Sequence, residues 1–343
     1  MHVTGLQLIW FVLIGFLWAG YFFLEGFDFG IGMLLPFITN GDLERRGMLN
    51  AIGPIWDGNE VWLIVAGGAT FAAFPLWYST MFSAFYLALF VVLVMLIVRG
   101  MSFEFRGLRT STRWRANWDR VNFLGSLIPS LIWGVAFADL LKGIPLNAQH
   151  QYTGTFLGLL QPYALLGGLT MVALFVLHGA TFLSLKTTGE LHDKATMAAR
   201  RVAPAATVIL LAFLAWTYFV ARAHGNSGAV PGFIPVTAFL LVAAVSWLVR
   251  EHLNGWAFVF TGVAILALTI TIFMTLYPNV ITSSTAFSDS LSIATAASQR
   301  YTLNIMTIVA VIFTPFVLLY QGWTYWIFRK RLTLPKTPST VES

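Results

Sequence analysis

Long hydrophobic stretches recur from one end of the chain to the other, and they constrain the fold more than any other feature. Each stretch has about 20 residues, enough for a helix to cross the ~30 Å hydrocarbon core of a bilayer. Of the 343 residues, 58% are hydrophobic and only 10% are charged, whereas soluble domains carry about 25% charged residues. The stretches are continuously apolar and do not alternate, which favours helices over barrel strands. The sequence therefore predicts an all-α integral membrane protein with a single polytopic membrane domain over residues 1–343.

We predict nine transmembrane helices from these stretches. The first segment lacks a basic region and a small-residue cleavage site, so we expect a retained span and not a signal peptide. The chain has no cysteine, which excludes a disulfide framework, a zinc finger, a c-type haem attachment and an iron–sulfur site. The predicted helices cover residues 6–38, 50–73, 77–99, 118–141, 159–185, 202–222, 231–249, 254–276 and 303–328.

Basic residues are distributed unevenly among the predicted loops. All but three of the 20 Lys and Arg residues lie after odd-numbered helices or in the C-terminal tail; the exceptions are Lys142, Arg222 and Arg300. The positive-inside rule then places the N-terminus outside and the C-terminus in the cytoplasm, which requires an odd number of helices. The net charge of +6 is thus a signal of topology and gives no support to nucleic-acid binding.

Two loop regions are open to more than one interpretation. The arginine-rich segment 99–120 is typical of a cytoplasmic anchor beside anionic headgroups, and a partner-docking surface is the alternative. The longest non-cytoplasmic segment, 277–302, is rich in Ser, Thr and Ala and is compatible with a surface helix or a loop.

Four carboxyl groups lie within the first two predicted helices. Asp57 and Glu60 belong to GPIWDGNEVW (residues 53–62), which has no Lys or Arg, and Glu25 and Asp28 belong to the first helix. Each pair is spaced by three residues and so shares one helix face. If residue 43 is the tip of a helical hairpin, Asp28 and Asp57 are 15 and 14 positions from it, and Glu25 and Glu60 are 18 and 17. We therefore expect the four carboxyls to gather at one depth.

Such a cluster has two plausible roles. Charged groups are costly in a membrane, so these side chains should face the protein interior or a water-filled cavity. Desolvation and mutual repulsion favour protonated carboxyls, and the cluster can then accept and release protons as a relay does. Structural hydrogen bonding between helices is the alternative. A metal site is less favoured, because no His lies at ligand spacing beside the acids.

His178 is the one histidine well inside a predicted helix. A bis-His haem site would need a second embedded His, and the chain has none. Ligation by His178 and a Met stays open, but any of ten Met residues fits it. A packed, hydrogen-bonded His178 is the preferred interpretation. A copper oxidase centre, which needs several His, is excluded.

Several segments in order along the chain resemble the second subunit of cytochrome bd quinol oxidases. The match is weaker over residues 220–250, where some members are longer. The similar segments are EGFDFGIGML (25–34), RRGMLNAIGPIWDGNEVWL (45–63), GGATFAAFPLWYSTMFSAFYLAL (67–89), RGMSFEFR (99–106), WGVAFADLLKGIP (133–145), HGATFLSLKTTGELH (178–192) and TLNIMTIVAVIFTPFVLLYQGWTYW (302–326).

The resemblance implies a subunit of a bacterial cell-membrane complex that oxidises quinol and reduces O₂ to water. Each main subunit would have nine helices, arranged as two four-helix bundles plus one peripheral helix. Haem b558, haem b595 and haem d would lie on subunit I, and this chain would carry no haem. A structural quinone in this subunit occurs in some members, and small accessory subunits are possible further partners.

The resemblance also implies roles for individual residues. The subunit would stabilise subunit I and provide a cytoplasmic proton route through Asp57 of the WDGN motif, with Asp28 of the GFD motif as its neighbour. Glu60 and Glu25 match less firmly. The rival hypotheses are a stand-alone proton- or cation-coupled transporter that uses the same carboxyls, and a membrane protein that binds haem through His178.

Overall fold

The structure is a computed structural model, and it describes residues 3–224, 230 and 232–334. Lys336, one of the 20 basic residues counted above, and residue 231, the predicted start of the helix 231–249, lie outside this part. Helices form most of it, as the sequence predicts. The longer elements are α1 (Gly5–Ile38), α2 (Asp42–Ile52), α3 (Trp56–Ala73), α4 (Pro75–Ala84), α5 (Tyr86–Phe105), α6 (Thr112–Lys142), α7 (Pro162–Lys186), α8 (Glu190–Ala223), α9 (Phe233–Arg250), α10 (Asn254–Leu276) and α12 (Arg300–Ile327).

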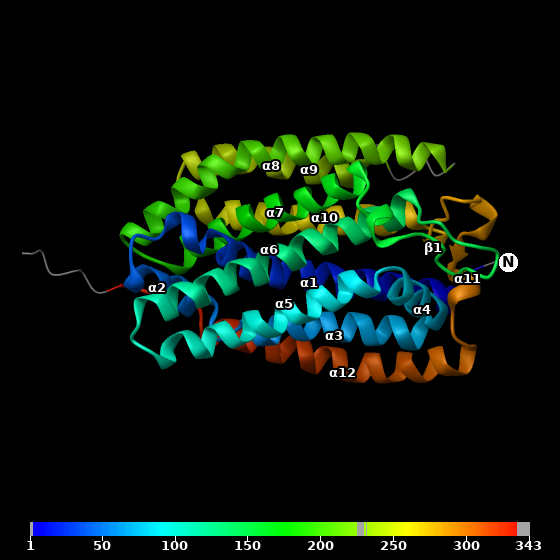
Figure 1. Cartoon of the computed structure of the whole chain (residues 1–343), viewed down its shortest axis with the longest axis horizontal. Coiled ribbons are helices and arrows are strands. Elements are labelled where there is room, and N and C mark those ends of the chain that lie inside the picture. The colour runs from blue at the N-terminus through cyan, green and yellow to red at the C-terminus, as the bar shows by residue number, and fades with distance from the viewer. Residues whose placement is uncertain (1–2, 225–229, 231, 335–343) are drawn as a thin grey trace, which may run out of the picture.

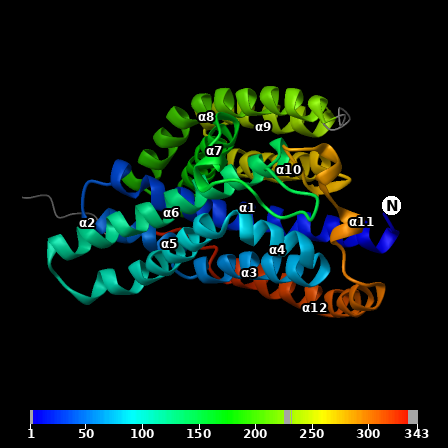
Figure 2. The same cartoon turned by 45° about the vertical axis from the view of Figure 1, so that its right-hand side comes forward.

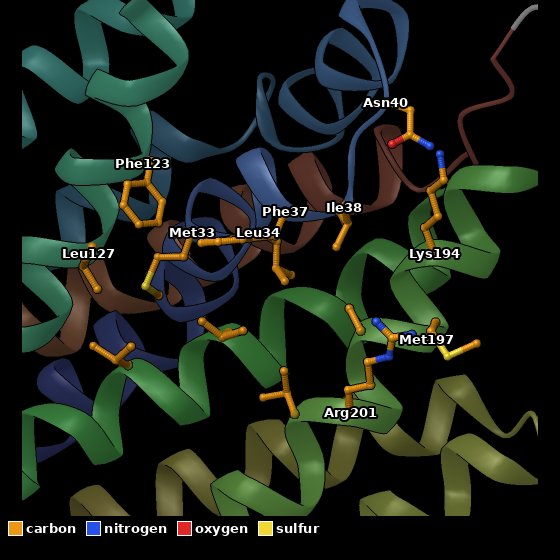
Figure 3. A pocket seen from close by; sticks show the side chains of 14 residues that line it. Met33, Leu34, Phe37, Ile38, Asn40, Phe123, Leu127, Lys194, Met197 and Arg201 are labelled. Carbon is orange, nitrogen blue, oxygen red and sulfur yellow. The ribbon is translucent and has the colours of Figure 1, made fainter. Parts of the chain in front are cut away.

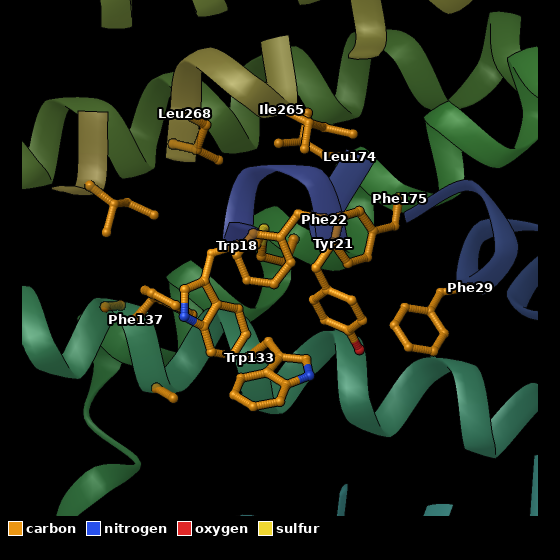
Figure 4. Close-up of a cluster of buried hydrophobic side chains, with 14 of the residues drawn as sticks. Trp18, Tyr21, Phe22, Phe29, Trp133, Phe137, Leu174, Phe175, Ile265 and Leu268 are labelled. Carbon is orange, nitrogen blue, oxygen red and sulfur yellow. The ribbon is translucent and has the colours of Figure 1, made fainter. Parts of the chain in front are cut away.

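Helix α1 lies at the centre of the molecule and contacts α3, α6, α7 and α10 (Figure 1). Helices α8 and α9 lie on one side of this core, and α3 and α12 lie on the other (Figures 1 and 2). Aromatic side chains fill the space around α1: Trp18 lies 4.8 Å from Trp133 and 5.0 Å from Phe137 between ring centroids (Figure 4). Between Tyr21 and Leu35 every residue of α1 except Phe23 is buried, which explains why most residues of this part are apolar around the whole helix.

A pair of glycines brings α1 and α7 into close contact. A Cβ atom added to Gly30 would lie 1.9 Å from the Phe175 carbonyl oxygen, and one added to Gly179 would lie 2.5 Å from the Gly30 carbonyl carbon. Small residues allow helix backbones to approach closely where packing within the membrane drives association. The two glycines therefore fix the separation of α1 and α7.

Eight of the described helices are long and apolar enough to cross a membrane: α1, α5 with the short 3₁₀ turn Arg106–Leu108, α6, α7, α8, α9, α10 and α12. Helix α3 has 18 residues and carries both Asp57 and Glu60 in its first turns, so its composition is less apolar. This helix occupies most of the predicted second span.

Several predicted helix boundaries are wrong for identifiable reasons. The predicted helix 50–73 is broken between α2 and α3, where residues 53–55 form a turn around Pro54. The predicted helix 77–99 consists of α4 and α5, interrupted at Phe85. Helices α6 and α8 begin earlier than predicted, because their first turns are polar and do not contribute to a hydropathy signal.

Residues 277–299, most of the predicted loop 277–302, form a small cap of mixed structure, and α12 begins directly after them. Strands β1 (Asn279–Ile281) and β2 (Leu291–Ser292) pair antiparallel, followed by the short helix α11 (Ile293–Ala296). The 3₁₀ helix η3 (Phe287–Asp289) lies between the strands, and η2 (Phe156–Leu159) precedes α7. The cap is tied to the loop after α6, because the Ile144 amide donates to the Thr282 carbonyl at 3.1 Å.

Candidate functional site

A buried arginine joins three helices in the core. Arg99 of α5 donates through Nη1 to Glu25 Oε1 of α1 and to Glu60 Oε1 of α3, the latter at 2.9 Å. Arg99 and Glu25 are completely buried, while the Glu60 side chain is 20% exposed. The arginine thus supplies the positive charge that the sequence around the acids lacks. Glu25 and Glu60, predicted to lie at one depth, meet here.

Asp28 is held by a second group of hydrogen bonds. Asn59 of α3 donates through Nδ2 to Asp28 Oδ2 at 2.7 Å. The Asn59 side-chain oxygen accepts from Gln321 Nε2 at 2.9 Å and from the Tyr325 hydroxyl at 2.8 Å. Asn59 therefore links the acid on α1 to α12, although these residues are far apart in the sequence.

Several polar atoms of this cluster have no protein partner among the described residues. They are Glu25 Oε2, Asp28 Oδ1, and Nε and Nη2 of Arg99. The Arg99 guanidinium also lies over the rings of Phe29 and Phe103, with its carbon 4.7 and 5.6 Å from the ring centroids. Buried polar atoms are normally satisfied. These orphan atoms leave the cluster with capacity for water or for additional protons.

Asp57 lies outside the cluster, contrary to the expectation that it faces Asp28. Its side chain is exposed in the separate chain, and its Oδ1 accepts from the Gly58 amide at 2.8 Å. The depth count assumed one continuous helix from residue 50 to residue 73. The turn at residues 53–55 instead starts α3 as a new helix, on which Asn59 and not Asp57 faces Asp28. Asp57 precedes Glu60 by three residues on the same helix, so the two carboxyls remain neighbours along α3.

A second ionic network lies at the end of the molecule that carries α2. Arg106 binds Asp119 at 2.6 Å and Asp42 at 2.7 Å, and Asp42 also binds Arg115 at 2.8 Å. Arg45 adds a 3.1 Å bond to Asp119. The interpretation of residues 99–120 as a cytoplasmic anchor beside anionic headgroups is therefore wrong for Arg99 and Arg106, which are buried, and stays a prediction for the arginines that follow them.

The sequence did not reveal the role of Arg99, because this residue ends an apolar stretch and was counted among the basic residues of the following loop. A signal was present in RGMSFEFR. Arg99, Ser102, Phe103 and Arg106 have the i, i+3, i+4, i+7 spacing of one helix face. Such a face with arginine at both ends predicts internal partners for both.

Another buried acid, Asp139 of α6, was also missed. Its Oδ1 accepts a 3.3 Å hydrogen bond from Gln161 Nε2, and its Oδ2 has no partner among the described residues. It is far along α6 from the Arg106 network, near the capped end of the molecule. Asp139 is therefore not a member of the cluster around Arg99.

His178 is packed against aromatic rings and fully hydrogen-bonded. Its Nδ1 lies 2.7 Å from Thr261 Oγ1 and its Nε2 lies 3.2 Å from the Phe23 carbonyl oxygen. The ring stacks on Phe258 with centroids 4.7 Å apart. Neither ring nitrogen is free to bind haem iron. Within the described part of the chain, no group of three or more His, Asp or Glu residues is arranged to hold a metal ion.

The helices and the buried carboxyl–arginine cluster define a multi-pass helical membrane protein with an internal ionisable site. Residues 6–328 match the family Cytochrome bd terminal oxidase subunit II, and the chain belongs to this family. The resemblance seen in the sequence is thereby confirmed, together with a multi-pass location in a bacterial membrane.

Curated relatives match over nearly their whole length. The chain is 40% identical to the cytochrome bd ubiquinol oxidase subunit 2 of Bacillus subtilis (strain 168), covering 98% of this chain and 100% of the relative. It is 38% identical to the cytochrome bd-I ubiquinol oxidase subunit 2 of Escherichia coli (strain K12), covering 96% and 95%. The solved bd oxidase from Geobacillus thermodenitrificans has the same fold, with a TM-score of 0.75 over 95% of this chain and 100% of that chain at 18% identity.

Proposed function

We propose that this chain is the second subunit of a membrane quinol oxidase, in which it stabilises the haem-bearing subunit I and supplies protons for the reduction of O₂ to water. Its named relatives are quinol oxidase subunits. The observation that carries the proton role is the group of Glu25, Asp28 and Glu60 near Arg99. Glu25 and Asp28 are completely buried and Glu60 is 20% exposed, and Glu25, Asp28 and Arg99 each have a polar atom without a partner among the described residues. The haems belong to subunit I, which agrees with the occupied nitrogens of His178.

Charge balance supports proton storage at this cluster. Glu25, Asp28 and Glu60 could contribute three negative charges, against one positive charge on Arg99. An uncompensated charge inside a membrane costs several kcal/mol at least, about 2.5–3.5 by insertion measurements. A neutral cluster would hold two protons on its three carboxyls, and changes in the charge of the complex would alter that number.

Asp57 is the proposed entrance to the cluster. An exposed carboxyl on a membrane helix must meet water or a polar protein surface, since contact with lipid is costly. Protons could then pass from Asp57 to Glu60 along one face of α3, and from Glu60 through the shared Arg99 environment to Glu25 and Asp28. Asp57 and Asp28 are therefore assigned to the two ends of one route.

The membrane topology of this proposal has nine spans: the eight long apolar helices described above and α3, which is the second span in chain order. A helix of 18 residues is about 27 Å long, and α3 packs beside α1 and α12. The ends of α1 and α5 near Arg45, Arg46 and Arg113 would be cytoplasmic, with the N-terminus outside and the C-terminus inside. We assign the chain a single membrane domain of two four-helix bundles plus one peripheral helix, with quinol and O₂ as the reactants of the complex.

The rival functions receive no specific support. Nothing in the comparisons points to a stand-alone transporter, because the matching proteins are oxidase subunits. Direct haem binding through His178 would require breaking two hydrogen bonds and a ring stack.

The test is Asp57→Asn in the purified complex with subunit I. We expect quinol-driven O₂ consumption to fall about tenfold or more, equivalent to ~1.4 kcal/mol in the barrier, with the haem absorption spectrum unchanged. Glu104→Gln is the matched control, because Glu104 is an exposed carboxyl on α5 outside the cluster. Normal turnover in a fully assembled Asp57→Asn complex would refute the route, and loss of the haems would assign Asp57 to assembly instead.

A further inference from the structure

A groove of about 610 Å³ lies between α1, α6, α7 and α8 (Figure 3), and no residue of the carboxyl cluster lines it. Its volume is within the ~300–1,000 Å³ range of ligand sites. Most of its wall is apolar, including Leu34, Phe37, Phe123, Leu127 and Val176. The groove also opens sideways, because the side chain of Phe37 at its edge is 75% exposed.

One end of the groove is basic. Lys194, Met197, Ala198, Arg201 and Val202 recur in α8 at the spacing of a single helix face, and this face lines the groove. Figure 3 shows Lys194 and Arg201 at the same end as Asn40, just past the end of α1. Lys194 and Arg201 are the charged residues of the lining, and no acid belongs to it.

The basic side chains near this end differ in whether the protein already neutralises them. Lys194 binds Glu44 at 2.6 Å and Glu190 at 2.7 Å. Arg200 donates through Nη2 to the Val249 carbonyl at 3.1 Å. Arg201, in contrast, has no hydrogen-bond acceptor or ion-pair partner in the part of the chain that the structure describes. Its charge is available to a ligand from outside.

We propose that this groove binds one anionic phospholipid of the surrounding leaflet. Arg201 binds the phosphate, because a guanidinium matches phosphate oxygens with two parallel hydrogen bonds. The Asn40 amide, whose side chain makes no hydrogen bond to the described residues, completes the headgroup site. An acyl chain lies along Phe37, Leu127 and Val176, where the groove follows residues 33–38 of α1 for about 8 Å.

A lipid fits these observations better than a soluble anion does. Free phosphate would use the basic end alone and leave the apolar wall empty, whereas an amphiphile contacts both. In the proposed topology this end is cytoplasmic, where the leaflet is rich in anionic lipids. The side opening lets a lipid enter from the bilayer without unfolding any helix.

The experiment uses the delipidated complex with subunit I and native mass spectrometry. Phosphatidylglycerol and phosphatidylcholine with identical acyl chains are added separately, and retained lipid is counted at increasing activation. We expect wild-type complex to retain phosphatidylglycerol preferentially and Arg201→Gln to lose about tenfold of that preference, ~1.4 kcal/mol. Met197→Trp, a bulkier side chain at a site that is 47% exposed, narrows the groove mouth and lowers retention of both lipids.

Arg113→Gln is the matched control. Arg113 is an exposed arginine at the same end of the molecule and outside the groove, so its loss should leave lipid selectivity unchanged. Three results would overturn the proposal: equal phosphatidylglycerol retention by wild type and Arg201→Gln, displacement of the lipid by inorganic phosphate, or occupation of the groove by a helix of an accessory subunit in the intact complex.

Discussion

At the residue scale, the carboxyl cluster depends on a single cation. Arg99 bonds to both Glu25 and Glu60, and it has no contact with solvent. Burying ions is costly, but removing one member of a buried pair is costlier because it leaves its partner uncompensated. The stability of the whole subunit should therefore be sensitive to Arg99.

We expect Arg99→Met to destabilise the assembled complex by about 3–5 kcal/mol, the usual cost of breaking a buried ion pair. Thermal unfolding of the purified complex measures the change. Adding Glu25→Gln to Arg99→Met should restore part of the loss, because the double variant no longer buries that unpaired carboxylate. Arg46→Gln, at an exposed arginine of α2, is the control. Equal melting of Arg99→Met and wild type would contradict the assignment.

Much of this cluster could be predicted from the sequence, but its geometry could not. Spacing of three residues predicts that Glu25 and Asp28 share a face of α1, and the structure has both buried. The cation, Arg99, comes from α5, about 40 residues beyond Glu60. No pattern within one segment of the sequence identifies it as the partner of Glu25 and Glu60. Which residue of α3 meets Asp28 depends on where that helix begins, and hydropathy does not locate the turn before Trp56.

At the element scale, close contact between α1 and α7 relies on Gly30 and Gly179. We expect Gly30→Ala to push the helices apart, because its Cβ would overlap the Phe175 carbonyl and rigid backbone cannot yield. Core overpacking costs roughly 1–3 kcal/mol and sometimes more, so the melting temperature of the complex should fall. Gly255→Ala, in the first turn of α10, is the control, since nothing lies within 4 Å of the added Cβ. We expect Gly30→Ala to have a lower melting temperature than the control variant, and equal melting temperatures of the two variants would refute this role of Gly30.

Hydropathy predicts which segments are helical more accurately than it predicts where each helix begins and ends. The predicted stop at residue 73 is correct, and Pro75 explains it, because a residue before proline is disfavoured in helical conformation. The extra turns of α8 before residue 202 are amphipathic and begin with Glu190. Their helicity comes from packing one apolar face against the core, which a search for 20-residue apolar windows overlooks.

At the scale of the whole molecule, the outer side formed by α3 and α12 is largely exposed in the separate chain. Only Leu303 of α12 is buried, although the helix has 28 residues. The exposed stripe of α3 runs from Asp57 through Val61 and Ile64 to Phe71. A stripe that contains a carboxyl requires a polar neighbour at one end. Sequence composition could not identify this side, because lipid-facing and partner-facing helices are equally apolar.

The central claim is that Asp57 admits protons to the oxidase, and single-turnover proton uptake tests it most directly. The fully reduced complex is mixed with O₂ in weakly buffered solution containing a pH-indicating dye. We expect Asp57→Asn to slow proton uptake at least about tenfold with O₂ binding unchanged, while Glu104→Gln behaves as wild type. Proton uptake at the wild-type rate in the Asp57→Asn complex would contradict the claim.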